Sequence, residues 1–312
     1  VYDQPEDLRR WTLGDASSAS GELGGAFNFG GIGVSKVYQI NPYFIKSPQA
    51  GFTGAVALPS TVDVYMNGAR VQSQSLAPGT FNLQNLNYQG ATGLNNFEYV
   101  IKDPFGREQR VSFPYFFSDQ LLAKGLQEYS YNVGAMRDNY GVSSNDYGTA
   151  VISALHRYGV SDTLTIGMSG DATPDQINVG PSAALNTVRA GVFTAGLAVS
   201  YDSDITPRSG AAASVSHTFL SGPFSSQLFV RRFTEDYSVV GFTPVYKPKL
   251  QGSAGVSYDT VNTGNFSLSY SEQTVFGGAI DQHATTFGYS RTLAGNISIS
   301  ANVSRVVDTT SG

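Results

Sequence analysis

The chain has 312 residues and a formal net charge of −5, with 14% charged residues against roughly 25% in an ordinary soluble protein. Tyr (18) and Phe (19) are abundant, which argues against a disordered chain. No apolar run approaches the ~18 residues of a membrane-spanning helix. The 19 basic residues are scattered, so we expect no nucleic-acid partner. The absence of cysteine excludes disulfides and thiolate metal sites.

Residues 1–51 contain two strand patterns, at 10–14 and 30–40. The run Gly30-Gly-Ile-Gly33 has the spacing of a phosphate-binding glycine motif, but no predicted helix follows it to hold a phosphate. A glycine-rich strand is therefore the better interpretation. The region 1–51 begins the strand-rich part of the chain.

Residues 52–118 have a different character. Residues 61–71 predict a hairpin with its turn at Asn67-Gly68, and further turns are predicted at Pro78-Gly79 and Asp103-Pro-Phe-Gly106. Such closely spaced short strands predict a small β-sandwich. Its predicted core residues are Val62, Val64, Phe81, Leu83, Phe97, Tyr99 and Ile101. A core below ~70 residues is marginal unless a neighbour supports it.

From about residue 126 to the end of the chain, apolar and polar residues alternate. In 265–271, Phe266, Leu268 and Tyr270 share one face and oppose Asn and Ser. In 296–304, one face likewise carries Ile297, Ile299, Ala301 and Val303, opposite Asn and Ser. Turn signals at 159–162, 220–223, 261–264 and 294–296 separate such strands. The polar face is small, neutral and hydroxylated.

Alternating segments of about ten residues, with turns between them and aromatic residues near their ends, are typical of outer-membrane β-barrels. Aromatic residues that fit two girdles are Tyr129, Tyr131, Tyr140, Tyr147, Tyr158, Tyr201, Phe219, Phe224, Tyr258, Tyr270 and Tyr289. A soluble sandwich or solenoid also alternates, but its wet face normally carries Lys and Glu. We therefore predict an all-β fold, a transmembrane antiparallel β-barrel with an inserted small β-sandwich. The first barrel strands lie in 1–51, the sandwich and its tethers in 52–118, and the continuing barrel strands in 119–312. The sandwich would lie inside the lumen or at its mouth.

The sequence gives little indication of chemistry. His156, His217 and His283 each stand alone, without a partner at metal-binding spacing, and no nucleophile-elbow motif accompanies the many serines. We expect no catalytic residue, no metal site and no cofactor. His217 is in phase with Val215 and Phe219 and is predicted to be structural at a membrane interface.

Three segments resemble the plug domain of fimbrial outer-membrane ushers. They read Leu58-Pro-Ser-Thr-Val-Asp-Val-Tyr-Met-Asn-Gly68, Leu76-Ala-Pro-Gly-Thr-Phe-Asn-Leu83 and Ile101-Lys-Asp-Pro-Phe-Gly-Arg-Glu-Gln109. The same resemblance continues through 114–115, 121–122, 125–131, Gly134 and Arg137. Residues 10–15 resemble the usher strands just before the plug, and 140–141, 146–148 and 156–167 resemble those just after it. The ordered match runs from about 9 to 170, and beyond it only barrel character continues.

This resemblance implies a pore of the chaperone–usher pathway in the outer membrane of a Gram-negative bacterium, with a barrel of roughly two dozen strands. The implied partners are pilin subunits, periplasmic chaperone–subunit complexes and outer-membrane lipid, and the plug gates the lumen. About 13 candidate strands are an odd number, whereas single-chain bacterial barrels normally close with an even one. We therefore expect a fragment of the central pore, starting at Val1 without a leader, with open edge strands.

Under this hypothesis the functional device is mechanical. Two tethers, about 46–54 and 113–120, contain the hinge candidates Pro48, Gly51, Gly54, Pro114 and Ser118. The candidates for gating contacts between the plug and the lumen wall are Asp63, Arg70, Lys102, Asp103, Arg107, Glu108 and Arg110. An equal alternative for Arg107 and Glu108 is decoration of a solvated edge.

Two other classes of protein stay open. An outer-membrane porin-like solute channel with an internal constriction domain would pass small solutes without a chaperone partner, and the plug-like segments argue against it. A secreted β-rich adhesin or autotransporter passenger would be soluble without detergent, and the neutral strand faces argue against it.

Overall fold

The computed structural model describes residues 1–19, 21–83, 92–241, 246–260, 262–278, 281–293 and 298–309. These residues form strands β1 to β20 and two short 3₁₀ helices, so the predicted all-β class is confirmed. Among them, no helix is long and apolar enough to cross a membrane.

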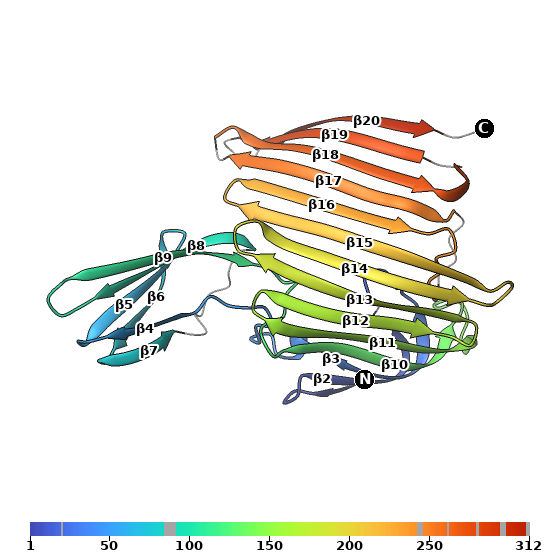
Figure 1. Ribbon diagram of the computed structural model, residues 1–312, viewed down its shortest axis with the longest axis horizontal. Helices are drawn as coiled ribbons and strands as arrows, with labels where there is room; N and C mark the ends of the chain where they lie inside the picture. Colours follow the sequence, from blue (N-terminus) through green and yellow to red (C-terminus); the bar gives the residue numbers. More distant parts are fainter. Residues whose placement is uncertain are drawn as a thin grey trace.

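Most of the strands form one curved antiparallel sheet, which we call the wall (Figure 1). In spatial order its strands are β1 (Tyr2–Gln4), β2 (Arg9–Ser17), β3 (Asn28–Lys36), β10 (Gln127–Arg137), β11 (Tyr147–Ser161), β12 (Leu164–Ala172), β13 (Gln176–Thr187), β14 (Gly191–Asp202), β15 (Arg208–Ser221), β16 (Phe224–Phe233), β17 (Pro248–Thr260), β18 (Gly264–Val275), β19 (Asp281–Thr292) and β20 (Ser298–Thr309). Because β3 pairs directly with β10, the insertion between them interrupts the sequence without interrupting the sheet.

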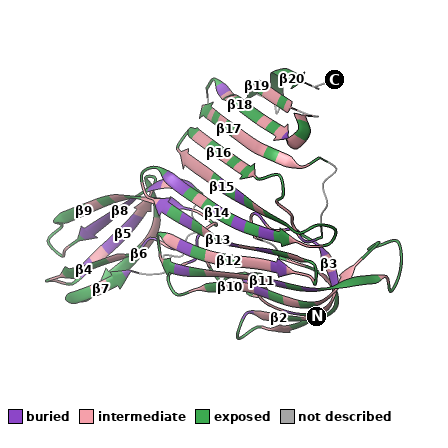
Figure 2. Cartoon of the chain, turned by 45° about the vertical axis from the view of Figure 1, so that its right-hand side comes forward, coloured by how far each residue is buried: buried purple, intermediate pink, exposed green. Residues whose placement is uncertain are grey.

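The wall is a trough and not a closed barrel. Within the described residues, β20 pairs only with β19, and β2 pairs only with β1 and β3. The long strands β2, β3 and β10 to β20 correspond to the predicted set, and a partial barrel is what the sequence led us to expect (Figures 1 and 2). The predicted turn at 294–296 and the predicted lipid-facing Ile297 lie outside the described residues.

The two rims of the wall differ in the length of their connections. At one rim, only Asp162-Thr163 joins β11 to β12, and only Gly222-Pro223 joins β15 to β16, where turns were predicted. At the other, residues 18–27, 138–146 and 234–247 connect their strands. We call these the short-turn rim and the long-loop rim. In outer-membrane barrels the short turns are periplasmic and the longer loops extracellular.

The inserted strands form a separate sandwich. They are β4 (Phe52–Val56), β5 (Ser60–Met66), β6 (Ala69–Leu76), β7 (Gly79–Leu83), β8 (Gly93–Lys102) and β9 (Glu108–Phe117). One sheet has the order β6-β5-β8-β9, and β4 pairs with β7. The β5–β6 turn is Asn67-Gly68 as predicted, and both residues have positive φ (51° and 85°), which suits Asn and Gly.

A compact apolar core holds the sandwich together. Val62, Val64, Phe97 and Tyr99 have no exposed surface. The Tyr99 ring lies between Phe52 and Phe113, with centroids 4.4 and 5.5 Å away. Of the predicted core residues, Leu83 and Ile101 are also buried, and Phe81 is partly buried against the same cluster.

The sandwich lies beside the short-turn rim and not within the trough (Figure 1). The predicted strand 30–40 ends at Lys36, and Tyr38–Ile40 forms a 3₁₀ helix instead. Tyr38 is buried there with Leu8 and Leu122. Because the Tyr38 ring is buried in this cluster, the chain leaves the wall here. The first of the two segments that connect the wall to the sandwich begins at this point.

Candidate functional site

The wall has a polar concave face and an apolar convex face. Along β12, Thr165 and Asp171 are buried on the concave face, whereas Ile166 and Met168 are 46% and 50% exposed on the convex face. Other buried polar residues of the concave face are Ser153, Asn178, Ser200 and Ser214. Exposed apolar residues of the convex face include Ile152, Leu197, Val199, Val215 and Leu268. A broad band of exposed apolar side chains faces lipid in transmembrane barrels.

Aromatic residues border the apolar band at both rims. Near the short-turn rim lie Tyr129, Tyr158, Phe224, Tyr258 and Tyr289. Near the long-loop rim lie Tyr140, Tyr147 and Tyr201. This distribution agrees with the two girdles that the sequence predicts.

Many hydroxyl groups of the concave face bond one another across neighbouring strands. Thr194 and Ser216 are 2.6 Å apart between their oxygens, as are Ser225 and Ser257, and Thr286 and Ser304 are 2.9 Å apart. Each pair consists of residues directly opposite in register. At these positions the polar groups of the trough already have partners, whereas the buried hydroxyl of Ser214 has none among the described residues.

The sandwich rests on the short-turn rim through a small set of contacts. Leu94 at the start of β8 pairs with Ser221 at the end of β15. The Phe116 ring stacks on Phe219 at 6.1 Å. The buried side-chain amide of Asn186 donates to the Phe116 carbonyl over 2.8 Å. The base of the sandwich thus packs against the ends of β13, β14 and β15 at this rim.

Three charged residues fix the connecting segments to the wall, and we call them the anchor triad. The carboxylate of Glu128 on β10 accepts from Lys46 Nζ at 3.2 Å and from Arg157 Nη1 at 2.6 Å. Arg157 also donates to the Gln120 carbonyl, and the Ala123 N–H donates to the Lys46 carbonyl over 2.8 Å. One carboxylate therefore joins a cation from the first segment to a cation that holds the second.

Two further contacts complete this attachment. The buried Leu122 donates its N–H to the Thr165 hydroxyl on the concave face over 2.9 Å. The Tyr38 hydroxyl donates to the Gln127 carbonyl over 2.6 Å. Burial, reinforced by the charge of Glu128, raises the pKa of Tyr38 to about 12.

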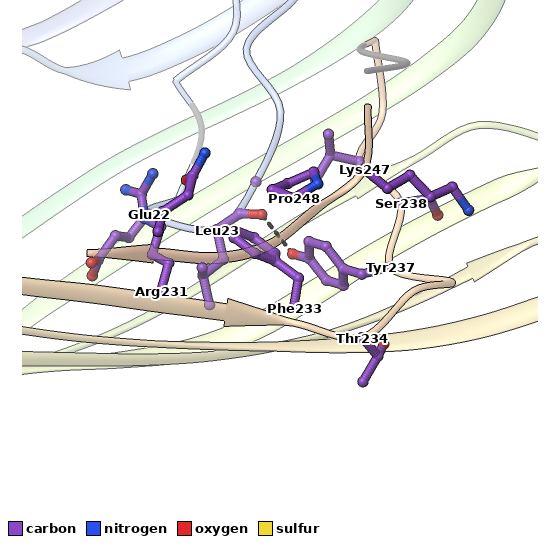
Figure 3. A pocket seen from close by; sticks show the side chains of 12 residues that line it. Glu22, Leu23, Arg231, Phe233, Thr234, Tyr237, Ser238, Lys247 and Pro248 are labelled. Atoms are coloured by element: carbon purple, nitrogen blue, oxygen red, sulfur yellow. Dashed lines mark hydrogen bonds between the residues drawn. The ribbon is translucent and has the colours of Figure 1, made fainter. Parts of the chain in front are cut away.

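The described parts of two loops, residues 18–19 with 21–27 and 234–241 with 246–247, fold into the trough from the long-loop rim and meet there. Tyr237 of loop 234–247 donates its hydroxyl to the Leu23 carbonyl of loop 18–27 over 2.6 Å (Figure 3). The same hydroxyl accepts from Asn178 on the floor at 2.8 Å. A Cβ on Gly25 would lie 2.1 Å from the Val240 carbonyl, so this close approach requires glycine. The loops join the two sides of the trough although they are far apart in sequence.

Two cavities lie in the trough beside the meeting loops and the anchor triad. A cavity of about 210 Å³ lies between the inward loops, lined by Leu23, Arg231, Tyr237 and Lys247 among others (Figure 3). A larger one of about 600 Å³ lies between loop 18–27 and the anchor triad, over Thr165 and Ser216. This larger space shows that the polar floor is not covered throughout.

The charged residues predicted as gating contacts pair within the sandwich. Asp103 pairs with Arg107 at 2.6 Å, Lys102 with Glu108 at 3.0 Å and Asp63 with Arg70 at 3.8 Å. Arg110 pairs with Glu98 and Glu108. The β8–β9 hairpin tip that carries several of them is the end of the sandwich farthest from the wall (Figure 1). Solvated edge decoration fits this arrangement, and wall contacts in another position of the sandwich stay a prediction.

The hinge candidates fall into two groups. Pro48, Gly51 and Ser118 lie in the connecting segments. Gly54 lies within β4, where a Cβ would meet the Phe81 ring at 2.7 Å, and Pro114 lies within β9 opposite Asn96. The strand ladders fix the backbone at Gly54 and Pro114 in this arrangement, so packing explains Gly54 and an edge-strand position explains Pro114.

Sequence reasoning missed the anchor triad and the meeting of the two loops. Glu128 and Arg157 stand in phase with small neutral residues of the concave face, and this mismatch was the available signal. Lys46 gave no such signal, because it lies in an irregular segment.

His217 lies on the convex face as predicted, with its ring 4.5 Å from Phe193. In the part of the chain that the structure describes, no group of three His, Asp or Glu side chains is placed to hold a metal ion.

Comparisons with known proteins agree with this architecture. The profile of the family described as outer membrane usher protein matches residues 8–217. The outer membrane usher protein FimC of Bordetella pertussis is 26% identical over 164 residues, which cover 53% of this chain and 18% of that protein.

Two solved structures share the fold. The P pilus usher (PapC) translocation pore aligns with a TM-score of 0.58 and 15% identity, covering 97% of this chain and 63% of that one. PapC in the Escherichia coli P pilus tip assembly intermediate with PapD, PapK and PapG aligns with a TM-score of 0.70 and 14% identity, covering 98% and 40%. This chain thus spans only part of the length of each relative.

An antiparallel wall with an apolar convex face, a polar concave face and an inserted sandwich defines a segment of an outer-membrane pore. The chain belongs to the outer membrane usher family. Proteins of this family are translocation pores of the Gram-negative outer membrane and not enzymes.

Proposed function

We propose that this chain is part of the wall of an usher pore that assembles and secretes pilus subunits delivered by a periplasmic chaperone, and that the sandwich is the plug domain that gates the lumen. Its partners are then pilin subunits and chaperone–subunit complexes. The observation that carries the proposal is a polar trough to whose rim an independently packed sandwich is joined by two anchored segments. The printed description of PapC with PapD, PapK and PapG as a pilus tip assembly intermediate supports it.

The proposed division of the chain follows the sheets. Residues 1–51 contribute the first wall strands, 52–118 the plug, and 119–312 the remaining wall strands. Residues 47–49 and 118–119 lie between the anchors and the sandwich, whose core begins with the buried Ala50, so the sandwich turns about these short stretches. In the position described here it lies aside from the trough, which is the position that secretion requires.

Removing the gate tests this function. In the full-length protein, residues 55–112 are replaced by a short Gly/Ser linker, and single-channel conductance is recorded in planar bilayers. We expect a folded, permanently open pore that admits large antibiotics, while pilus assembly fails or falls. Conductance equal to that of the intact protein would favour a solute channel with an accessory domain.

Locking the sandwich at the rim tests the same function without removing anything. Leu94 and Ser221 are direct partners across the contact, and cysteines at such positions have Cα atoms close enough for a disulfide. The chain has no cysteine of its own. We expect Leu94→Cys/Ser221→Cys to give a high-conductance pore when oxidised and normal gating after reduction. Each single variant serves as a control, and unchanged conductance on oxidation counts against the gate.

A further inference from the structure

Four side chains form a row on the convex face at the short-turn rim, one on each of four neighbouring strands. The register pairs Arg9 on β2 with Lys36 on β3, and Tyr129 on β10 with His156 on β11. The β3–β10 register brings Lys36 beside Tyr129. Arg9 Nε donates to the Tyr129 hydroxyl over 3.3 Å, and the Tyr129 ring stacks on His156 at 6.2 Å. We call these four residues the rim row.

The neighbouring rows show the depth at which the rim row lies. Two residues further along, the row consists of Trp11, Val34, Tyr131 and Ala154, and its two aromatic members, Trp11 and Tyr131, are 41% and 40% exposed. Another two residues along, the row is aliphatic: Leu13, Ile32, Val133 and Ile152 are 79%, 51%, 53% and 58% exposed. The order aliphatic, aromatic, cationic is that of a surface crossing from hydrocarbon to headgroups. The two cations of the rim row are therefore at the depth of lipid phosphates.

The positive charge of the rim row is only partly balanced. Arg9 Nη2 lies 3.5 Å from the Asp7 carboxylate, and Lys36 Nζ donates to the Asp7 backbone carbonyl over 2.5 Å. The Asp7 side chain is 59% exposed. Within the described contacts, the exposed Asp7 carboxylate thus pairs with Arg9 alone, and Lys36 has a neutral carbonyl as its hydrogen-bond partner. Guanidinium and ammonium groups placed side by side are suited to the oxygens of a phosphodiester.

The opposite end of the same convex stripe has no such surplus. Arg137 donates to the Asp15 carboxylate at 3.1 Å and to three backbone carbonyls, and its side chain is only 6% exposed. The Tyr147 hydroxyl donates to Asp15 at 2.8 Å, and the Tyr147 ring lies 5.0 Å from the Arg137 guanidinium. Hydrogen bonds within the protein already occupy this cation, so on strands β2, β3, β10 and β11 the described cations free to bind a headgroup lie at the short-turn rim.

We infer that the rim row is a binding site for one anionic phospholipid of the leaflet at the short-turn rim. Arg9 and Lys36 bind the phosphate, and the aromatic rings of Tyr129, Tyr131 and His156 support the upper part of the acyl chains. The site rests on the outer-membrane location of the chain and not on the proposed secretion function.

The test is lipid binding by the full-length protein in detergent, measured by native mass spectrometry with dioleoyl phosphatidylglycerol, dioleoyl phosphatidylcholine and lipid A as separate probes. We expect phosphatidylglycerol to bind more tightly than phosphatidylcholine, and the difference to shrink with salt. Losing one cation near an anionic headgroup weakens binding roughly 5-fold, so Arg9→Gln/Lys36→Gln should weaken it roughly 25-fold.

Two variants control for folding and for unspecific charge effects. Arg9→Lys/Lys36→Arg keeps both charges and should retain the preference for phosphatidylglycerol. Arg232→Gln removes an exposed cation of the convex face near the long-loop rim and should leave phosphatidylglycerol binding unchanged. Equal binding of the two phospholipids, or wild-type binding by Arg9→Gln/Lys36→Gln, overturns the site. Loss of lipid A binding alone in that variant overturns the assignment to a phospholipid of this leaflet.

Discussion

The wall and the sandwich are built from strands with the same alternating pattern, yet they place their apolar side chains in opposite surroundings. In the sandwich, Val62, Val64 and Phe97 have no exposed surface. In the wall, Leu13 and Leu197 are 79% and 61% exposed. The sandwich therefore carries its own core, whereas the wall relies on lipid to cover its apolar face and on ladder hydrogen bonds for cohesion. Alternation alone specifies two faces, and the character of the polar face shows which solvent each face meets.

The largest expected effect tests whether the sandwich core is self-contained. Phe97→Ala should cost about 3–5 kcal/mol, as for other buried phenylalanines. A core of this size supplies little more than that in total, so the isolated segment 52–118 should unfold. Urea denaturation followed by near-UV circular dichroism measures the effect. Phe105→Ala is the matched control, because Phe105 is 77% exposed at the hairpin tip. Equal losses in both variants would contradict a packed core at Phe97.

The next prediction concerns the two faces of the wall. Leu268→Arg or Ile299→Arg places a charge on the convex face and should destabilise the barrel by about 2–4 kcal/mol if the site is near the midplane. Ser269→Arg or Ser300→Arg on the concave face should be mild. Unfolding of the full-length protein in lipid vesicles measures both. Equal damage on the two faces would mean that both are buried in protein.

A smaller effect is expected at the joint between the two regions. Glu128→Gln removes the charge that both Lys46 and Arg157 contact, and hydrogen bonds to charged groups contribute about 1.5–3 kcal/mol. The connecting segments should then be less firmly held, and single-channel recordings should show more frequent switching between conductance levels. Gln127→Ala, next to it on the opposite face, is the control. Unchanged switching would show that the triad does not restrain the sandwich.

The charged residues of the sandwich allow a second test of the proposed gating. If Asp103 and Arg107 contact the lumen wall when the pore is closed, Asp103→Ala or Arg107→Ala should give intermittent opening. If they only fix the hairpin tip, as their 2.6 Å ion pair indicates, the recordings should match those of the unchanged protein. The same bilayer experiment distinguishes the two cases.

The smallest expected effect is a pH dependence of the sandwich. Hydrogen bonds from Lys102 and Arg110 lower the pKa of Glu108 below its usual range. A carboxyl whose pKa is lower in the folded state stabilises the fold above its ordinary pKa of about 4.3, and this stabilisation is lost as pH falls through the lowered value. The melting temperature of the isolated segment should therefore decrease as the pH is lowered below about 4. Glu108→Gln should flatten that part of the profile, and an unaltered profile would assign the acid sensitivity to other groups.

Local signals in the sequence were sufficient for the strands and tight turns, because a period of two and an Asn67-Gly68 pair act over a few residues. The core of the sandwich followed from the same pattern. The anchor triad did not, since Lys46 and Glu128 are brought together only by pairing of β3 with β10. Tyr237 and Leu23 are 214 residues apart, and no spacing rule connects them. The placement of the sandwich at the rim likewise depends on contacts that no short segment encodes.

Under the proposed secretion function, the paired hydroxyls of the trough affect the speed of transport. An object that moves along a surface is delayed by each deep minimum in its interaction energy, and escape slows tenfold for every 1.4 kcal/mol of depth. Thr194 and Ser216, like Ser225 and Ser257, already bond each other, so a passing protein gains little by replacing one bond with another. A wall lined by such pairs then presents a passing subunit with few deep energy minima along these strands.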